Sequence, residues 1–289
     1  MRIGLSTPVV MQLPGVASDW ERDAGADELA GVARIADDLG YDHLTCAEHI
    51  AVPEGAAEGR GLTYWDPLST LAFLAAHTRR IRLTTSVIVL GYHHPLEIAK
   101  RFGTLDRLSG GRLVLGVGVG SLEEEFALLG AQFADRGERA DDALAALRVS
   151  LSTPRPAYEG RFYRYRGVVV EPCAMQPHVP IWVGGRTMRS LNRAVRLADG
   201  WMPFGLSTTA LSEMLARVDA PPGFEVVLAT GRAVDPTTDP GGTETRLARL
   251  RDAGATVVTC SVVAASAAHY GEQLAALRDI TDRLAEHTG

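Results

Sequence analysis

A glutamate and a histidine, Glu48 and His49, stand at the end of an apolar segment (residues 41–49, YDHLTCAEH) that is expected to be a strand. An imidazole can take up or release a proton near neutral pH, and a neighbouring carboxylate can tune it. The pair therefore predicts an acid–base site, with a purely structural histidine as the alternative. His43 lies at the opposite end of the same segment and is expected to be structural.

Small residues end three further apolar segments. Ser86 places a hydroxyl within the β-branched run TTSVIV, which is typical of a buried strand, and Ser6 ends the first apolar run of the chain. Gly116 and Gly118 belong to the sequence GVGVGS, whose spacing is that of a strand and not of a dinucleotide-binding loop. Because glycine has no side chain, these positions would leave room for a flat ring.

The sequence GGRT follows another apolar run and precedes an amphipathic stretch. Glycines at the beginning of a helix present free N–H groups to a phosphate, so Gly184 and Gly185 are candidates for a phosphate site. Arg186 would add a guanidinium fork for an anion, and Thr187 is expected to cap the helix. The alternative is a tight turn with an arginine on the surface.

The chain carries none of the common motifs of metalloproteases, serine hydrolases or nucleotide-binding P-loops. The adjacent His93 and His94 point in different directions and make a poor metal pair. We interpret the acidic run 123–125 as a helix beginning, where negative charge is favoured by the helix dipole. The candidates are a histidine, a hydroxyl and a phosphate-binding turn, with no metal site and no strong nucleophile. This combination indicates that a bound organic cofactor supplies the chemistry.

Apolar runs alternate along the chain with amphipathic stretches, and this pattern predicts eight strand–helix units. Such alternation implies parallel strands joined by right-handed crossovers, so the expected fold is a closed (β/α)8 barrel formed by residues 1–289 as a single domain. The segment 153–180 interrupts the rhythm with five prolines and four aromatic residues, and is expected to be an extended excursion or small hairpin. Active sites of such barrels lie where the strands end, which is where the candidate residues stand.

The composition agrees with an ordinary globular enzyme. Acidic residues number 35 and basic residues 29, giving a net charge of −6, so nucleic-acid binding through the overall field is not expected. No apolar run approaches the ~20 residues of a membrane helix, and the first ten residues do not resemble a signal peptide. The three cysteines are far apart and predict no disulfide framework, which fits a cytoplasmic location.

Three long segments together resemble the luciferase-like monooxygenase superfamily, and within it the branch that uses the deazaflavin coenzyme F420. They are YDHLTCAEH, IRLTTSVIVLGYHHPLEIAKRFGTLDRLSGGRLVLGVGVGS and EPCAMQPHVPIWVGGRTMRSLNRAVRLADGW. The resemblance runs from Arg2 to about Phe204 and is weaker beyond. It departs at Ser121, because many relatives have a tryptophan or asparagine after this strand.

The resemblance implies a (β/α)8 barrel with an excursion between units four and five, here 153–180, and a flavin-like ring across the barrel mouth. It places a non-proline cis peptide at Ser86-Val87 behind the ring, and His49 beside it. It also assigns the phosphate to the backbone of residues 184–187 and brings Gly116 and Gly118 close to the cofactor.

Three functions follow from this resemblance. The first is an F420-dependent oxidoreductase that moves a hydride to or from a small organic substrate, with His49 as acid, base or polariser and Glu48 tuning it. The second is an FMN-dependent monooxygenase that receives reduced FMN from a partner reductase. The third is a flavin-binding protein without turnover.

The remaining expectations concern the substrate side. Tyr64, Trp65 and Trp201 are expected to line the substrate pocket, and the segments 50–64 and 153–180 to form a lid. Dimers through the barrel helices are common in the family, so a homodimer is expected. Neither nucleic acid nor a membrane is expected as a partner.

Overall fold

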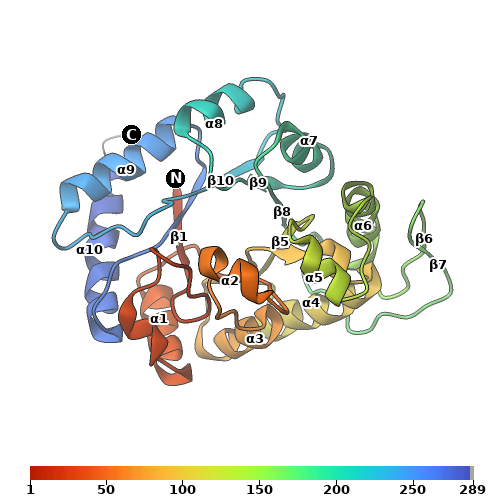
Figure 1. Ribbon diagram of the computed structural model, residues 1–289, viewed down its shortest axis with the longest axis horizontal. Coiled ribbons are helices and arrows are strands. Elements are labelled where there is room, and N and C mark those ends of the chain that lie inside the picture. The colour runs from red at the N-terminus through yellow and green to blue at the C-terminus, as the bar shows by residue number, and fades with distance from the viewer. Residues whose placement is uncertain (287–289) are drawn as a thin grey trace.

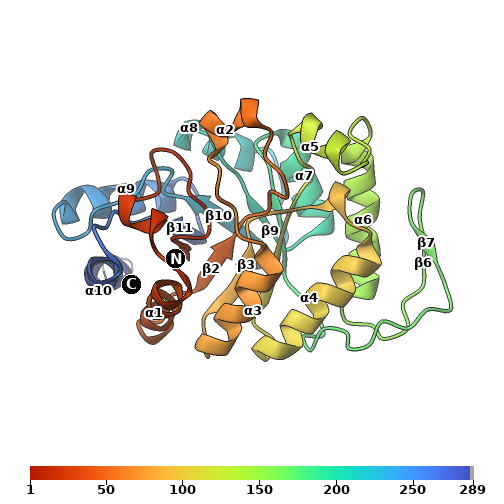
Figure 2. The ribbon, with the colours of Figure 1, turned by 60° about the horizontal axis from the view of Figure 1, so that its bottom comes forward.

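Eight parallel strands close into a barrel with helices around it in the computed structural model, which describes residues 1–286 (Figures 1 and 2). Closure follows from two pairings, since β1 bonds to both β2 and β11, and β3 bonds to β5. The short β4 continues β3 and also pairs with β5, so the two pieces form one barrel strand. The predicted (β/α)8 fold is confirmed. The end of the expected domain 1–289 lies outside the described residues.

The strands of the barrel are, in chain order, β1 (Arg2–Ser6), β2 (His43–Cys46), β3 (Arg82–Thr85), β4 (Ile88–Val89), β5 (Leu113–Gly118), β8 (Ile181–Gly184), β9 (Gly200–Met202), β10 (Glu225–Ala229) and β11 (Val257–Cys260). The α-helices are α1 (Ala26–Asp38), α2 (Glu54–Arg60), α3 (Pro67–His77), α4 (Pro95–Ser109), α5 (Glu123–Leu128), α6 (Arg136–Ser150), α7 (Met188–Leu197), α8 (Thr208–Leu215), α9 (Pro240–Asp252) and α10 (Ala267–Glu286). Two 3-10 turns, η1 (Asp19–Arg22) and η2 (Leu90–Tyr92), and a hairpin of β6 (Tyr158–Glu159) and β7 (Arg164–Tyr165) complete the elements.

Burial on both faces explains the composition of the strands. Every residue of β2, β5, β8 and β11 is buried, as expected for parallel strands with side chains inside the barrel and helices outside. Helix α1 buries one stripe, formed by Leu29, Val32, Ala33 and Ala36 at the spacing of an amphipathic helix. No helix within residues 1–286 is long and apolar enough to cross a membrane.

The segment 153–180 forms the expected hairpin, but not over the barrel mouth. The hydroxyl of Tyr158 and the backbone N–H of Phe162 both donate to Asp142 on α6, each at 2.6 Å, and Tyr165 bonds to Ser150 of the same helix at 2.6 Å. The hairpin β6–β7 therefore lies along the outer side of α6, away from α2 and α8 (Figure 2). In this structure it does not cover the strand ends, which corrects the expectation of a lid there.

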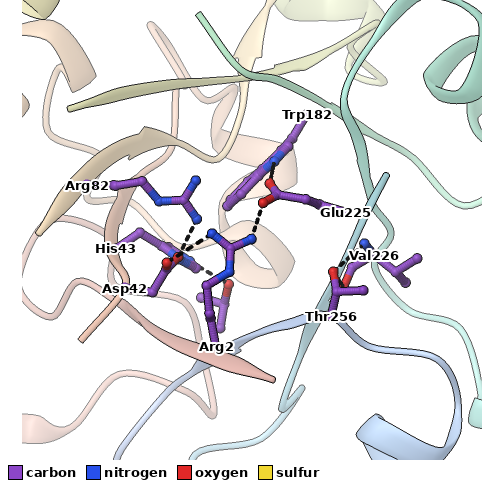
Figure 3. Close-up of polar contacts among 9 residues, drawn as sticks. Arg2, Asp42, His43, Arg82, Trp182, Glu225, Val226 and Thr256 are labelled. Atoms are coloured by element: carbon purple, nitrogen blue, oxygen red, sulfur yellow. Dashed lines mark hydrogen bonds and ion pairs between the residues drawn. The ribbon is translucent and has the colours of Figure 1, made fainter. Parts of the chain in front are cut away.

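A network of charged side chains links the strands at the opposite end of the barrel (Figure 3). Asp42, just before β2, accepts bonds from His43 at 2.8 Å, Arg82 at 2.5 Å and Arg2 at 3.3 Å. The other ring nitrogen of His43 bonds to Thr259 on β11 at 2.9 Å. His43 is fully buried, so its expected structural role is consistent with its contacts.

Glu225 extends this network to the other side of the barrel (Figure 3). It accepts a bond from the indole N–H of Trp182 at 2.5 Å and forms an ion pair with Arg2. The guanidinium of Arg82 lies over the Trp182 ring, 5.2 Å from its centre. The network thus connects β1, β2, β3, β8 and β10 at the ends where these strands begin.

The pKa of Asp42 makes this network sensitive to acid. Burial raises the pKa, but the bonds with His43 and Arg82 outweigh it and hold the pKa of Asp42 well below its usual range. A lowered folded-state pKa means that this stabilisation is complete above the ordinary Asp pKa of ~3.9 and is lost as the pH falls through the folded-state value.

We expect Asp42→Asn to lower the free energy of unfolding by about 2–4 kcal/mol at pH 7, because the mostly buried guanidinium of Arg82 loses its charged partner. The difference from the wild type should stay constant down to about pH 5 and shrink below pH ~4. Urea unfolding across this pH range measures it, with the exposed Asp38→Asn on α1 as a control. A difference between wild type and Asp42→Asn that does not depend on pH would contradict this assignment.

Candidate functional site

His49 lies just beyond the end of β2, at the barrel mouth. Its Nδ1 is 2.7 Å from a carboxylate oxygen of Glu125, and its ring meets that of Tyr64 edge-on at 4.6 Å. The side chain keeps 16% of its surface exposed, and within residues 1–286 nothing forms a hydrogen bond with its Nε2. Because a carboxylate only accepts, Nδ1 carries the proton of the neutral ring, and Nε2 is left with an unused lone pair.

Glu125, near the beginning of α5, is fully buried and accepts four hydrogen bonds. Besides His49, its donors are the backbone N–H groups of Ile50 at 2.7 Å and Ala51 at 3.1 Å, and the hydroxyl of Tyr92 at 2.9 Å. Burial raises the pKa of Glu125, but the bonds from Ala51, His49 and Ile50 outweigh it, so the pKa lies below its usual range. Glu125 is therefore ionised at neutral pH. Burial and the bond to this carboxylate raise the pKa of Tyr92.

Glu125 was not among the predicted site residues, because the acidic run 123–125 was interpreted as a whole as a helix beginning. Glu123 and Glu124 are indeed exposed, whereas Glu125 is not. The available signal was its position, since Leu122, Glu125 and Phe126 fall on one face of the turn and all are buried. A carboxylate on the apolar face of a helix needs a partner inside the protein.

The carboxylate of Glu48 forms no hydrogen bond with His49 within residues 1–286, which corrects the expectation that it tunes this histidine. Its carboxylate bonds to Nε2 of His93 at 2.7 Å and accepts the backbone N–H of Val89 at 2.7 Å. Burial lowers the pKa of His93, but the bond with Glu48 outweighs it and raises the pKa above its usual value. Glu48 thus fixes β4 and η2 in place behind the site, through a histidine that the sequence analysis set aside.

The glycines of β5 are explained by a close approach of the neighbouring strand. A Cβ added to Gly116 would lie 1.8 Å from the carbonyl oxygen of Thr85, and one added to Gly118 would lie 2.7 Å from Val87. The expected cis peptide at Ser86-Val87 is present. Thr85 and Val87 therefore fill the room that these glycines leave, which corrects the idea that it stays open for a ring.

Ser86 lies where β3 passes into β4. Its hydroxyl points to the sulfur of Met202 at 3.6 Å, and its backbone N–H donates to the carbonyl of Cys46 at 2.8 Å. Ser6 ends β1 and lines a small pocket together with Thr7, Ser261 and Tyr270, apart from His49. The structure therefore brings Ser86 to the strand ends, but does not join Ser6 to the histidine.

The turn between β8 and α7 fits a phosphate. Gly185 has φ +133°, a conformation that L side chains rarely adopt, and the backbone N–H groups of Gly185 and Arg186 donate to no group within residues 1–286. Thr187 caps α7 as expected, accepting the N–H of Ser190 at 3.3 Å. A Cβ on Gly184 would be 3.1 Å from Val87, so this turn also packs against the cis peptide segment. Free N–H groups at the N-terminus of a helix form an anion site.

A pocket of about 770 Å³ opens between α2, Tyr64, Leu13 and Phe204. This volume lies within the usual range of ligand sites. The guanidinium of Arg186 lies 5.8 Å from the ring centre of Phe204. The turn of residues 184–187, called the phosphate turn below, therefore adjoins the pocket. In Figure 2, α2 lies on the same side of the barrel as α5 and α8, above the strand ends.

Of the three aromatic residues expected in the pocket, only Tyr64 lines it. Trp65 packs against the core, and its backbone N–H donates to Val10 at 2.9 Å. Trp201 is fully buried, with its indole N–H bonded to Ser190 at 3.2 Å. It belongs to the core, because strand β9 turns this side chain toward α7 and not toward the mouth.

The sequence profile described as "Luciferase-like monooxygenase" matches residues 1–239. The chain belongs to this family. The luciferase-like relatives include uncharacterized proteins of Mycobacterium bovis and Mycobacterium tuberculosis, 34% identical over 198 residues, which is 68% of this chain and 68% of theirs. Members of this family are oxidoreductases and monooxygenases.

Two relatives with named activities differ in cofactor or reaction. An F420-dependent glucose-6-phosphate dehydrogenase of Microbacterium testaceum is 28% identical over 184 residues, 62% of this chain and 52% of that protein. A 4-hydroxyprotoasukamycin monooxygenase of Streptomyces nodosus is 38% identical over 125 residues, 43% of this chain and 32% of that protein.

Solved structures share the luciferase-like fold over nearly the whole chain. An F420-dependent secondary alcohol dehydrogenase superposes with a TM-score of 0.74 at 14% identity, covering 96% of this chain and 99% of that one. A monooxygenase from Streptomyces bottropensis superposes with a TM-score of 0.73 at 22% identity, covering 100% of both chains. At these identities the likeness establishes the fold.

We expect Gly116→Ala to lower the free energy of unfolding by at least about 2 kcal/mol, because the added Cβ collides with backbone and not with a flexible side chain. Gly31→Ala in α1 is the matched control, since its Cβ would meet nothing within 4 Å. The control should gain about 0.5–1 kcal/mol from helix propensity. Denaturant unfolding measures both variants. A Gly116→Ala variant as stable as the wild type would contradict the close approach of β3 to Gly116.

Proposed function

We propose that the protein is a coenzyme F420-dependent oxidoreductase that transfers a hydride to or from a small organic substrate. The observation that carries this proposal is the unpartnered Nε2 of His49, whose ring packs edge-on against Tyr64 in the wall of a pocket that the phosphate turn adjoins. Similarity to an F420-dependent glucose-6-phosphate dehydrogenase supports the choice of cofactor. When bound, the deazaflavin supplies the site that gives or takes the hydride.

The side chains of this protein would hold the cofactor and move the proton. Free N–H groups of Gly185 and Arg186, with the Arg186 guanidinium, would bind the phosphate. The interconversion of an alcohol and a carbonyl compound moves a hydride at the substrate carbon, exchanged with the cofactor, and a proton at the substrate oxygen. Nε2 of His49 would accept it from an alcohol, or donate it to the oxygen of a carbonyl in the reverse direction.

An FMN-dependent monooxygenase supplied by a partner reductase is the second candidate. The similarity to 4-hydroxyprotoasukamycin monooxygenase favours it. A phosphate turn serves both cofactors, so binding must be measured. The homodimer expected from the family remains a proposal for either function.

The cofactor choice predicts binding of F420 at micromolar or lower Kd, with FMN at least tenfold weaker, a difference of about 1.4 kcal/mol. Quenching of tryptophan fluorescence measures both titrations. Arg186→Ala should raise the F420 Kd several-fold, whereas Arg189→Ala, on the exposed side of α7, should not. Tighter binding of FMN would favour the monooxygenase. If neither cofactor bound, both candidates would be wrong.

The role of His49 predicts that His49→Ala binds F420 with a Kd within a few-fold of the wild type but loses turnover. A positioned acid–base group contributes about 10²–10⁴-fold to rate, so kcat should fall by this factor. His178→Ala, with a side chain that is 61% exposed, is the control and should keep its rate. Reduction of a panel of carbonyl compounds by F420H2, followed by absorbance, detects turnover. Equal rates in His49→Ala and the wild type would contradict the role of His49 as the acid–base group.

A further inference from the structure

One buried carboxylate connects the reactive histidine to the segment above it. Glu125 Oε2 is bonded to His49, while Glu125 Oε1 accepts the backbone N–H groups of Ile50 and Ala51. These two residues begin the segment 50–64, which contains α2 and forms one wall of the pocket. Glu125 itself comes from a different part of the chain, just after β5.

We propose that Glu125 is a positioning residue with two tasks: it keeps the His49 proton on Nδ1, so that Nε2 is left with a lone pair, and it holds the beginning of the segment 50–64 in place beside the histidine. The consequence for catalysis rests on the proposed function. The two structural tasks do not, because they follow from the contacts of the carboxylate.

The first task follows from hydrogen-bond chemistry. A neutral imidazole carries one N–H, and an ionised carboxylate accepts but does not donate. The bond at 2.7 Å therefore selects the Nδ1–H form of His49 and fixes the plane of the ring. A carboxylate behind a histidine plays this part for metal-bound and catalytic imidazoles in general.

Glu125 is the only carboxylate bonded to His49 within residues 1–286. Glu48 is the nearest acidic neighbour in sequence, but its oxygens are bonded to His93 and to the backbone of Val89. Of the other polar groups around His49, Tyr92 donates to Glu125 and the hydroxyl of Tyr64 donates to the backbone of Arg60.

The second task couples the pocket wall to the histidine. Moving residues 50–64 away from the mouth would break both backbone bonds and leave a buried carboxylate with two donors in place of four. Unpaired buried charge is costly, so the segment is held down for as long as Glu125 stays ionised. The orientation of His49 and the position of α2 therefore depend on the same group.

The decisive variant is Glu125→Gln. An amide oxygen can still accept from Ile50 and Ala51, but its NH₂ group would then face His49 and require a lone pair on Nδ1. We expect the proton to move to Nε2, which would then be a donor and not an acceptor. Glu124→Gln, the same change one residue earlier on the exposed side of α5, is the matched control.

Two readouts without turnover test the proposal. Long-range ¹H–¹⁵N correlation of histidine-labelled protein, at a pH where His49 is neutral, identifies the protonated nitrogen; His49→Ala assigns the signal. Hydrogen exchange follows the amides of Ile50 and Ala51. We expect Nδ1–H in the wild type and in Glu124→Gln, and Nε2–H with several-fold faster exchange in Glu125→Gln, because a neutral acceptor forms weaker bonds than a carboxylate.

The wild-type spectrum alone can contradict the first task, which is to keep the His49 proton on Nδ1. A protonated Nε2 in the neutral ring would do so even if Glu125→Gln fails to fold. Unchanged exchange in a folded Glu125→Gln variant would overturn the second. With F420 bound, we expect kcat of Glu125→Gln to fall by about 10²–10⁴-fold with little change in KM. If the wild type does not bind F420, the proposed function fails, whereas the tautomer and exchange results still decide the role of Glu125.

Discussion

A carboxylate that is removed from solvent stays charged only where hydrogen bonds replace its water, and the mouth of this barrel is built around one such group. Glu125 collects donors from the loop after β2, from the turn after β4 and from the ring of His49. These segments are distant in sequence but adjacent here, because parallel strands of a closed barrel end at one rim. The site can be assembled only if β2, β4 and β5 are in register.

The two ends of the barrel use buried charge in opposite ways. At the end where the strands begin, Asp42 and Glu225 are bonded to arginines, a histidine and an indole, and every ring nitrogen of His43 has a partner. At the mouth, Nδ1 of His49 is bonded to a carboxylate, and Nε2 has no hydrogen-bond partner within residues 1–286. A network in which every polar group is bonded stabilises the fold, whereas a ring nitrogen without a partner can act on a ligand.

Sequence patterns were sufficient for the fold because they are local. Alternating apolar runs and amphipathic stretches predicted the eight units, a threonine before an amphipathic stretch predicted the cap of α7, and the prolines of 153–180 predicted the hairpin. The partners of individual side chains depend on tertiary contacts. Three consecutive glutamates look alike in the sequence, and only the packing of α5 selects Glu125; likewise, Glu48 precedes His49 but bonds to His93.

A crystal structure of the protein with F420 would show whether a deazaflavin binds at this mouth, between the phosphate turn and His49. We expect the phosphate within hydrogen-bonding distance of the Gly185 and Arg186 N–H groups, and the ring beside Nε2 of His49 with the Glu125 bonds intact. A phosphate bound elsewhere, or a ring that leaves Nε2 of His49 facing away from it, would show that the proposed site is wrong.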